Sequence, residues 1–170
     1  LFAVDSAKDG LDIQPMDLMS CDKNSSVTLD GVTVDASAII GEIDCGGEVF
    51  SRAFIRAVIA KCIQMTGSLT SCLDLTLGYV KQRSQFGRSI ATFQAIQHHC
   101  SNMAIDLEGS RHVAYQAAWA LSTGIDPNRY AHMAKAWLNE STQRISVLAH
   151  QSHGAIGFTH DYDLQMHTRW

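Results

Sequence analysis

The spacing of apolar residues changes near residue 41. Residues 1–41 contain short apolar stretches interrupted by turn-forming residues, whereas from residue 42 onward apolar side chains recur every three or four positions, which is the period of a helix. The pattern therefore predicts β structure in 1–41 and a helical domain in 42–170. Because so short a β segment cannot enclose a core of its own, we interpret it as the C-terminal part of a larger β domain.

Stretches rich in β-branched residues predict the strands of this segment. Residues 26–29 and 32–34 flank Asp30–Gly31, and an Asp-Gly pair readily adopts the positive φ angles of a two-residue hairpin turn. The pattern predicts a hairpin centred on that pair. Residues 1–4 predict a further strand, followed by a turn at Asp9–Gly10.

Two long helices are predicted at the start of the helical domain, from Glu48 to Gln82 and from Phe93 to Ser122, with Gly124 as the stop of the second. The inward positions predicted for the first helix are Phe54, Val58, Cys62, Met65, Leu69, Leu73 and Leu77. Those predicted for the second helix are Ile96, Cys100, Met103, Leu107, Ser110, Ala114, Ala117 and Leu121. The spacing of the second set is typical of near-parallel helix packing.

The third helix is predicted to start at Pro127, with Asp126 as its N-cap, and to end near Gly154. Its predicted inward positions are Ala134, Trp137, Leu138, Ile145 and Leu148. A fourth helix is predicted to start near Asp161, whose side chain would cap it. Because short connections favour antiparallel neighbours, the predicted fold class is mainly α: an up-and-down antiparallel four-helix bundle preceded by a small β segment.

Composition narrows the possible functions. Of 170 residues, 46% are hydrophobic and 18% are charged, which suffices for a packed core and excludes a disordered chain. The 13 basic and 17 acidic residues give a net charge of −4, without the basic excess that nucleic-acid binding requires. No apolar stretch reaches the roughly 20 residues that cross a bilayer, so no membrane span is predicted.

The number and spacing of the cysteines indicate the cellular compartment of the protein. Their number is odd and they never form a C-x-x-C pair, which predicts reduced, mostly buried thiols and a cytoplasmic protein. The five are Cys21, Cys45, Cys62, Cys72 and Cys100.

The polar stretch between the first two helices, residues 79–88, is the first candidate for chemistry. A guanidinium such as that of Arg83 can bind two phosphate oxygens, a carboxamide can donate to a third, and the ring of Phe86 can lie against an adenine or ribose. These groups suit a ligand that contains a diphosphate. The alternative is structural: Lys81 and Arg83 would offset the dipole of a helix C-terminus, and Phe86 would pack on the end of the bundle.

Residues 94–96 and the glycine-containing turn at 151–158 are the next candidates. Backbone amides in such a turn can approach a phosphate closely, although glycines also occur in helix–helix turns for their backbone angles alone. Four histidines near the C-terminus have no acidic or thiolate ligand interleaved at a recognisable metal spacing, so we interpret them as surface or capping residues and predict no metal site. These are His150, His153, His160 and His167. Sequence motifs of hydrolases and of nucleotide triphosphatases do not occur.

Taken together, three motifs resemble the C-terminal half of the acyl-CoA dehydrogenase flavoproteins. They are Arg83-x-Gln85-Phe86-Gly87, then Phe93-Gln94-Ala95-Ile96-Gln97, then Gln151-x-x-Gly154-x-x-Gly157-Phe158. Their order and spacing match the family, and the resemblance extends to the N-terminal stretch, which is similar to the second half of the family's middle β domain. The resemblance implies a C-terminal four-helix bundle that builds a tetramer, with FAD bound between subunits.

The resemblance also implies roles for individual residues. Arg83 and Gln85 would contact the FAD diphosphate of a neighbouring protomer, with Phe86 near the adenosine and Gln94 near the adenine end. The remaining phosphate contacts would come from Gln151 and from the amides around Gly154 and Ala155. The family commonly has a second glycine where this chain has Ala155, so we expect a modest loss of room there.

The family reaction removes the α-proton of an acyl-CoA with a carboxylate base while a hydride passes to the flavin, and an electron-transfer partner then accepts the electrons. The commonest base of the family would lie after Trp170, and its alternative position is Ala57, which cannot take a proton. No catalytic residue is therefore assigned. An arginine often found beside the alternative base falls at Val58, which carries no charge.

The leading hypothesis is a C-terminal part of an FAD-dependent acyl-CoA dehydrogenase that supplies FAD contacts and the interface of a homo- or hetero-oligomer. The alternatives are a non-catalytic partner subunit of a heteromeric dehydrogenase, a related flavin monooxygenase, and a helical interaction module without a cofactor.

Overall fold

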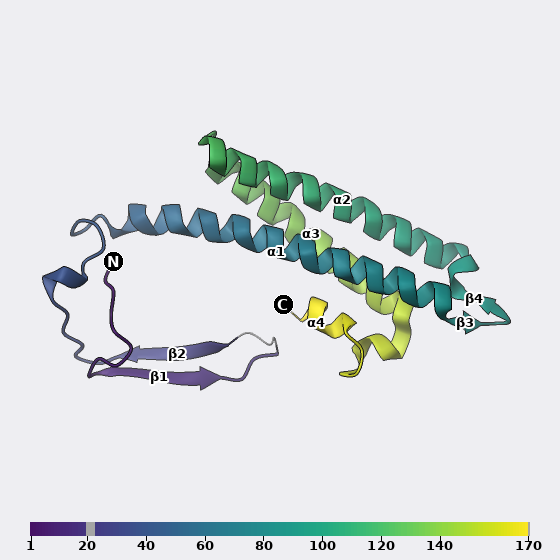
Figure 1. The fold of residues 1–170 in the computed structure, drawn as a ribbon, viewed down its shortest axis with the longest axis horizontal. Coiled ribbons are helices and arrows are strands. Elements are labelled where there is room, and N and C mark those ends of the chain that lie inside the picture. Colours follow the sequence, from purple (N-terminus) through teal and green to yellow (C-terminus); the bar gives the residue numbers. More distant parts are fainter. Residues whose placement is uncertain (20–22, 170) are drawn as a thin grey trace. The chain divides into compact units, whose positions relative to one another are not determined.

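The computed structural model describes residues 1–19 and 23–169, which form two compact units, Leu1–Phe54 and Ile55–Trp170. The predicted domain boundary after residue 41 stays a prediction. Figure 1 shows a mainly helical chain with a small β segment at its start, so the predicted fold class is confirmed. Among the described residues no helix is both long and apolar enough to cross a membrane.

The first unit contains one two-stranded antiparallel sheet. Strand β1 (Leu11–Met16) pairs with β2 (Asn24–Leu29), with Leu11 opposite Leu29. The predicted hairpin at Asp30–Gly31 is therefore wrong, because the partner of β2 precedes it in the chain. Gly31 does have a positive φ of 61°, but residues 32–34 form no strand, and the amide of Asp30 donates to the carbonyl of Gly10 (2.8 Å).

The predicted strand at 1–4 is reduced to an isolated bridge between Phe2 and Ile39. The turn at Asp9–Gly10 is present, with a φ of 86° at Gly10. Apolar side chains of the sheet remain exposed: Val27 by 56% and Leu29 by 62%. These strands thus bury no core of their own among the described residues of this unit, and the assignment of the segment to a larger β domain stays a prediction.

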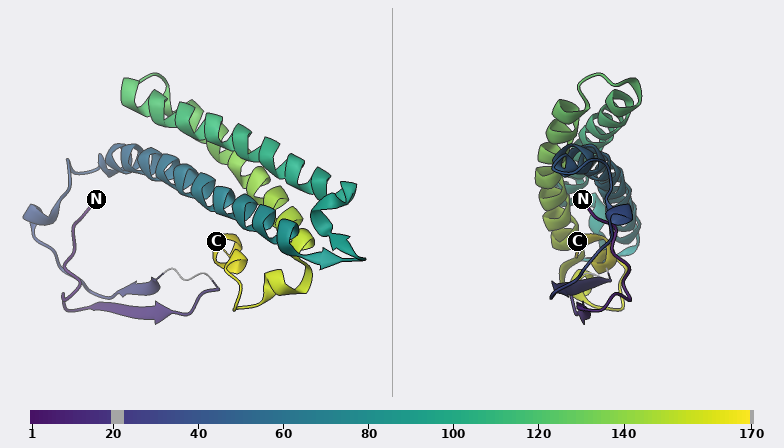
Figure 2. Two further views of the ribbon diagram at one scale, coloured as in Figure 1. Left: turned by 45° about the vertical axis from the view of Figure 1, so that its right-hand side comes forward. Right: turned by 90° about the vertical axis from the view of Figure 1, so that its left-hand side faces the viewer.

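Long helices dominate the second unit. Helix α1 (Gly46–Gln82) begins in the first unit and continues into the second, followed by α2 (Gln94–Thr123), α3 (Pro127–His153) and the short α4 (Leu164–Thr168). Figure 2 shows α1, α2 and α3 side by side. Helix α2 ends at Gly124, which has a left-handed φ of 74°. The side chain of Asp126 accepts from the amide of Arg129 at the start of α3, as predicted.

The fourth helix differs from its prediction. A 3-10 helix, η3 (Gly154–Phe158), follows α3 directly, and α4 starts at Leu164 rather than near Asp161. Its N-cap residue is Asp163, whose side chain accepts no capping hydrogen bond. The carboxylate at position 161 is therefore not the cap that the sequence indicated.

The buried face of α1 is rotated from the predicted one. Cys62 and Leu69 are buried as expected, but Phe54 is 50% exposed, and Val58, Met65 and Leu73 are only partly buried at the edge of the core. The buried positions are Ile55, Ile59, Cys62, Thr66, Leu69, Cys72, Thr76 and Val80. Two threonines fit this face because each hydroxyl donates to the carbonyl four residues earlier, at 2.9 and 2.7 Å.

Helices α2 and α3 pack closely through small residues. The predicted seam of α2 is confirmed at its centre, where Met103, Leu107, Ser110, Ala114 and Ala117 are buried. The partners on α3 include Leu138 and Ile145, both fully buried as predicted.

Trp137 was predicted to face inward and is instead 40% exposed. Its ring lies on the surface of α2 at Gly109, where an added Cβ atom would stand 2.7 Å from the ring. A glycine on the neighbouring helix therefore makes room for a large ring outside the core.

The four described cysteines are free, and Cys21 lies outside the described residues. Cys62 and Cys72 are buried and Cys100 is half-buried, whereas Cys45 is exposed. Burial raises the pKa of the Cys72 thiol to about 12. Such a thiol stays protonated at neutral pH and packs as a small apolar group.

Candidate functional site

Contacts bring the three sequence motifs to one end of the helical unit. The Ser89 hydroxyl, just after the first motif, donates to the Val80 carbonyl of α1 (2.9 Å). The Ser152 hydroxyl of α3 lies 3.5 Å from Nδ1 of His99 near the start of α2. Figure 1 shows the same arrangement, with the start of α2 and the β3–β4 hairpin at one end of the bundle.

The first motif forms a tight hairpin. Strand β3 (Ser84–Gln85) pairs with β4 (Arg88–Ser89), with Gln85 opposite Arg88. The two turn residues, Phe86 and Gly87, have φ angles of 56° and 78°. Positive φ at both positions defines the turn type whose twist suits a hairpin, but for a bulky residue such as Phe86 it costs about 1–2 kcal/mol. Backbone strain of this kind is concentrated at functional positions.

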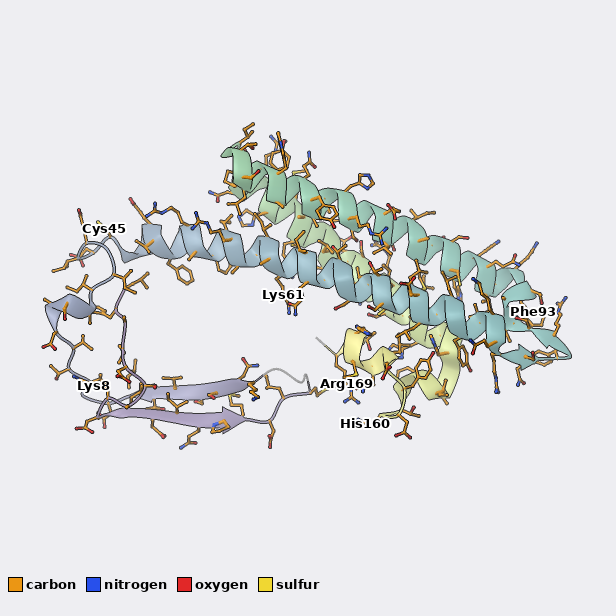
Figure 3. The ribbon with its side chains drawn as sticks, in the orientation of Figure 1. Lys8, Cys45, Lys61, Phe93, His160 and Arg169 are labelled. Atoms are coloured by element: carbon orange, nitrogen blue, oxygen red, sulfur yellow. The ribbon has the colours of Figure 1, made fainter. Side chains whose placement is uncertain are left out.

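Phe86 presents its ring to solvent, with 92% of the residue exposed. This excludes the alternative in which Phe86 packs into the end of the bundle. Its ring meets that of Phe93 in a T-shaped contact at a centroid distance of 6.0 Å. Phe93 immediately precedes α2, and Figure 3 labels it beside the hairpin. An exposed aromatic ring held in this way offers a flat apolar surface to a ligand or partner.

Sequence reasoning missed Arg88. Its guanidinium carbon lies 4.2 Å from the centre of the Phe93 ring, a cation–π contact that links the hairpin to the start of α2. The available signal was a second arginine in the polar stretch 79–88, two residues after Phe86, but its partner ring could not be identified without the structure.

All seven residues predicted to contact FAD are exposed: Arg83, Gln85, Phe86, Gln94, Gln151, Gly154 and Ala155. Within 1–19 and 23–169, the side chains of Arg83 and of the three glutamines make no hydrogen bond or ion pair with protein. One guanidinium and three carboxamides therefore keep their donors available. This donor set fits a diphosphate, although the assignment of these residues to FAD stays a prediction.

The glycine-containing turn after α3 is tightly built. Gly154 has a φ of 67°, and an added Cβ at Gly157 would stand 3.0 Å from Cβ of His153 and 3.2 Å from Nδ1 of His150. The chain needs glycine at both positions, for backbone angle at one and for space at the other. Ala155 is not among the described residues with positive φ, so alanine introduces no backbone strain there.

His150 and His153 are packed beneath this turn, so their interpretation as surface or capping residues is wrong. Nδ1 of His153 donates to the Ala149 carbonyl (2.8 Å), and its Nε2 lies 3.1 Å from the Tyr162 hydroxyl. Because a carbonyl only accepts, Nδ1 carries the proton and Nε2 accepts from Tyr162. The ring also stacks on Tyr79 of α1 at 4.6 Å. His153 thereby joins α1, α3 and the C-terminal turn.

His150 stacks on Phe158 at 4.4 Å, and its Nε2 lies 2.9 Å from the Thr168 hydroxyl. Its Nδ1 is buried without a partner among the described residues. Burial lowers the pKa of both His150 and His153, and the charge of His153 lowers that of His150 further. No group of three or more His, Cys, Asp or Glu side chains within the described part of the chain could hold a metal ion.

These histidines predict a pH-dependent stability. Their pKa values are lowered in the folded chain, so the unfolded chain binds more protons as the pH falls below about 6.5. We expect the free energy of unfolding to be highest above that pH and to fall as the pH is lowered. Urea titrations from about pH 5 to pH 7.5 measure this, and His153→Phe should flatten the dependence.

His132→Phe is the matched control, because His132 is exposed on α3. It should keep the pH dependence of the unmodified chain. An equal flattening in both variants would contradict the role given to the buried ring.

Comparison with known proteins identifies a family model and relatives that match this chain. The family model for the acyl-CoA dehydrogenase C-terminal domain matches residues 45–170. The 3-(aryl)acrylate reductase of Clostridium sporogenes is 33% identical over 168 residues, covering 96% of this chain and 44% of that protein. The mitochondrial short/branched chain specific acyl-CoA dehydrogenase of Bos taurus is 31% identical over 171 residues, covering 99% of this chain and 40% of that protein.

Among solved structures, one described as PigA with FAD and proline superposes with a TM-score of 0.92 at 25% identity, covering 98% of this chain and 44% of that one. The chain thus spans less than half the length of the relatives it matches.

Proposed function

The chain belongs to the acyl-CoA dehydrogenase family, and on that premise we propose that it is the C-terminal part of an FAD-dependent oxidoreductase that converts an acyl-CoA thioester to a 2-enoyl-CoA. The observation that carries the proposal is the set of exposed donors and the exposed Phe86 ring at one end of the helical unit. A relative structure that contains FAD supports the choice of cofactor.

Each residue has a distinct task in this proposal. Arg83 and Gln85 bind the diphosphate, because a guanidinium can donate two parallel bonds to phosphate oxygens. Phe86 packs on the adenosine, and Gln94 binds at the adenine end.

The turn after α3 completes this phosphate site, through Gln151 and the amides at Gly154 and Ala155. The flavin, when bound, accepts the hydride that leaves the substrate. We further propose that these residues contact the FAD of a neighbouring protomer in a tetramer of a cytoplasmic protein, with a separate protein as electron acceptor.

The carboxylate base is not assigned within this chain. Ala57 of α1 has no titratable group, and neither does Val58 beside it. We propose that the proton acceptor comes from another part of the protein or from a partner subunit. This observation also favours a second candidate function, in which the chain is a non-catalytic subunit that lends its FAD contacts to an active partner.

The test uses the full-length protein, purified alone and with any subunit that copurifies. Under the proposal it retains FAD, and anaerobic addition of an acyl-CoA bleaches the flavin absorbance. Retention of FAD without bleaching, restored by adding a second subunit, would favour the non-catalytic role. A full-length protein that never retains a flavin would contradict both functions.

A further inference from the structure

We propose that Arg88 is a positioning residue for the adenosine end of FAD: its stack on Phe93 fixes the β3–β4 hairpin against the start of α2, so that both segments present their side chains to one ligand. The inference rests on the proposed function and extends it to a residue outside the three motifs. Its starting point is the cation–π contact of 4.2 Å between the two side chains.

The hairpin is fixed to the bundle at its base. The Ser89 hydroxyl donates to the Val80 carbonyl (2.9 Å) and is also within 3.2 Å of the Lys81 carbonyl, both at the end of α1. The backbone amide of Ile90 donates to the Arg83 carbonyl (2.9 Å), which closes the two strands. These bonds hold the base of the hairpin on α1, but they do not hold its tip on α2.

The contacts of the tip converge on one ring. The ring of Phe93 receives the Arg88 guanidinium over its face and makes a T-shaped contact with Phe86 at a centroid distance of 6.0 Å. Because strands of two residues are marginal on their own, these side-chain contacts are what restrains the tip. Phe93 also precedes Gln94 directly, so the same ring connects the hairpin to a predicted adenine contact.

Arg88 also lies on the same face of the hairpin as a proposed diphosphate contact. Residues directly opposite each other on paired strands point to the same face, and Arg88 is opposite Gln85. The positioning residue is thus a neighbour of Gln85, one of the two proposed diphosphate contacts. Restraining these groups before the ligand arrives reduces the ordering cost of binding.

The test measures the affinity of full-length apoprotein for FAD and for FMN, which lacks the adenosine half. Arg88→Ala and Phe93→Leu are each expected to weaken FAD binding about two- to fivefold, the size of an exposed cation–π contact. The double variant should weaken it no further than the single variants, because both remove one contact. FMN affinity and the melting temperature of the apoprotein should not change.

Two further arginine variants serve as reference and control. Arg129→Ala, at an exposed position near the start of α3, should leave both affinities unchanged. Arg83→Ala should weaken FAD binding, because it removes a proposed diphosphate contact. If Arg83→Ala weakens FAD binding and Arg88→Ala does not, the inference on Arg88 is wrong and the proposed function stands.

Three other results would also overturn the inference. They are additive losses in the double variant, equal losses for FAD and FMN, or a lowered melting temperature that accounts for the loss of FAD binding. If neither Arg83→Ala nor Arg88→Ala changes FAD affinity, the proposed FAD site itself fails.

Discussion

Replacing Leu138 by alanine is expected to lower the free energy of unfolding by about 2–5 kcal/mol. Leu138 is fully buried on α3 and belongs to the cluster that joins α1, α2 and α3. Its removal costs the transfer free energy of the side chain and leaves a cavity, because the small residues of α2 have no side chains long enough to fill it. Urea denaturation of the 170-residue chain, followed by circular dichroism, measures the change.

The control is Val147→Ala on the same helix, at a residue that is 61% exposed. Truncation there removes little buried surface, so the free energy of unfolding should change by less than about 0.5 kcal/mol. Similar losses in the two variants would mean that the helices do not pack in solution through the face described above.

The lengths and ends of the three long helices could be predicted from the sequence because their signals are local. Gly124 and Asp126 act through their own backbone and the next few residues, and both were identified correctly. The buried face of α1 was predicted less well, because Thr66 and Thr76 are polar by composition. Inside a helix their hydroxyls bond to the preceding turn, so they pack inward without an unsatisfied group.

Interactions between distant parts of the chain explain the remaining errors. An Asp-Gly pair indicates that the backbone can adopt a positive φ, but it does not determine which strand pairs with β2. The actual partner, β1, is determined by a register that runs from Leu11 with Leu29 to Met16 with Asn24. The exposure of Trp137 could not be predicted from local sequence either, because its position depends on a glycine in another helix.

The residues of the candidate site likewise fall into those that the sequence indicates and those that only the structure identifies. The motifs around Arg83, Gln94 and Gln151 could be found in the sequence, because the family resemblance supplies their order and spacing. Arg88 and His153 could not be identified, because their importance arises from contacts with Phe93 and Tyr162 that only the folded chain shows. The local sequence pattern therefore indicates the candidate site, and tertiary contacts identify the residues that pack around it.

Replacing Arg83 by methionine is expected to weaken FAD binding by full-length apoprotein roughly 10- to 100-fold. Hydrogen bonds to a charged group contribute about 1.5–3 kcal/mol, and methionine keeps the length of the side chain without its donors. The exposed guanidinium has no ion-pair partner within the described ranges, so its loss breaks no salt bridge of the fold. Isothermal titration calorimetry with FAD, and with FMN as the ligand that lacks the adenosine half, measures the effect.

Lys81→Met separates this role from the structural alternative. Lys81 is exposed in the last turn of α1, two residues before Arg83, and its positive charge offsets the helix dipole as that of Arg83 would. If Arg83 binds the diphosphate, Arg83→Met loses FAD affinity and Lys81→Met keeps it. If both arginine and lysine act only on the helix dipole, each variant lowers the free energy of unfolding by about 0.3–1 kcal/mol and FAD affinity is unchanged. That second result would remove the guanidinium from the cofactor site and leave the hairpin as a helix terminus only.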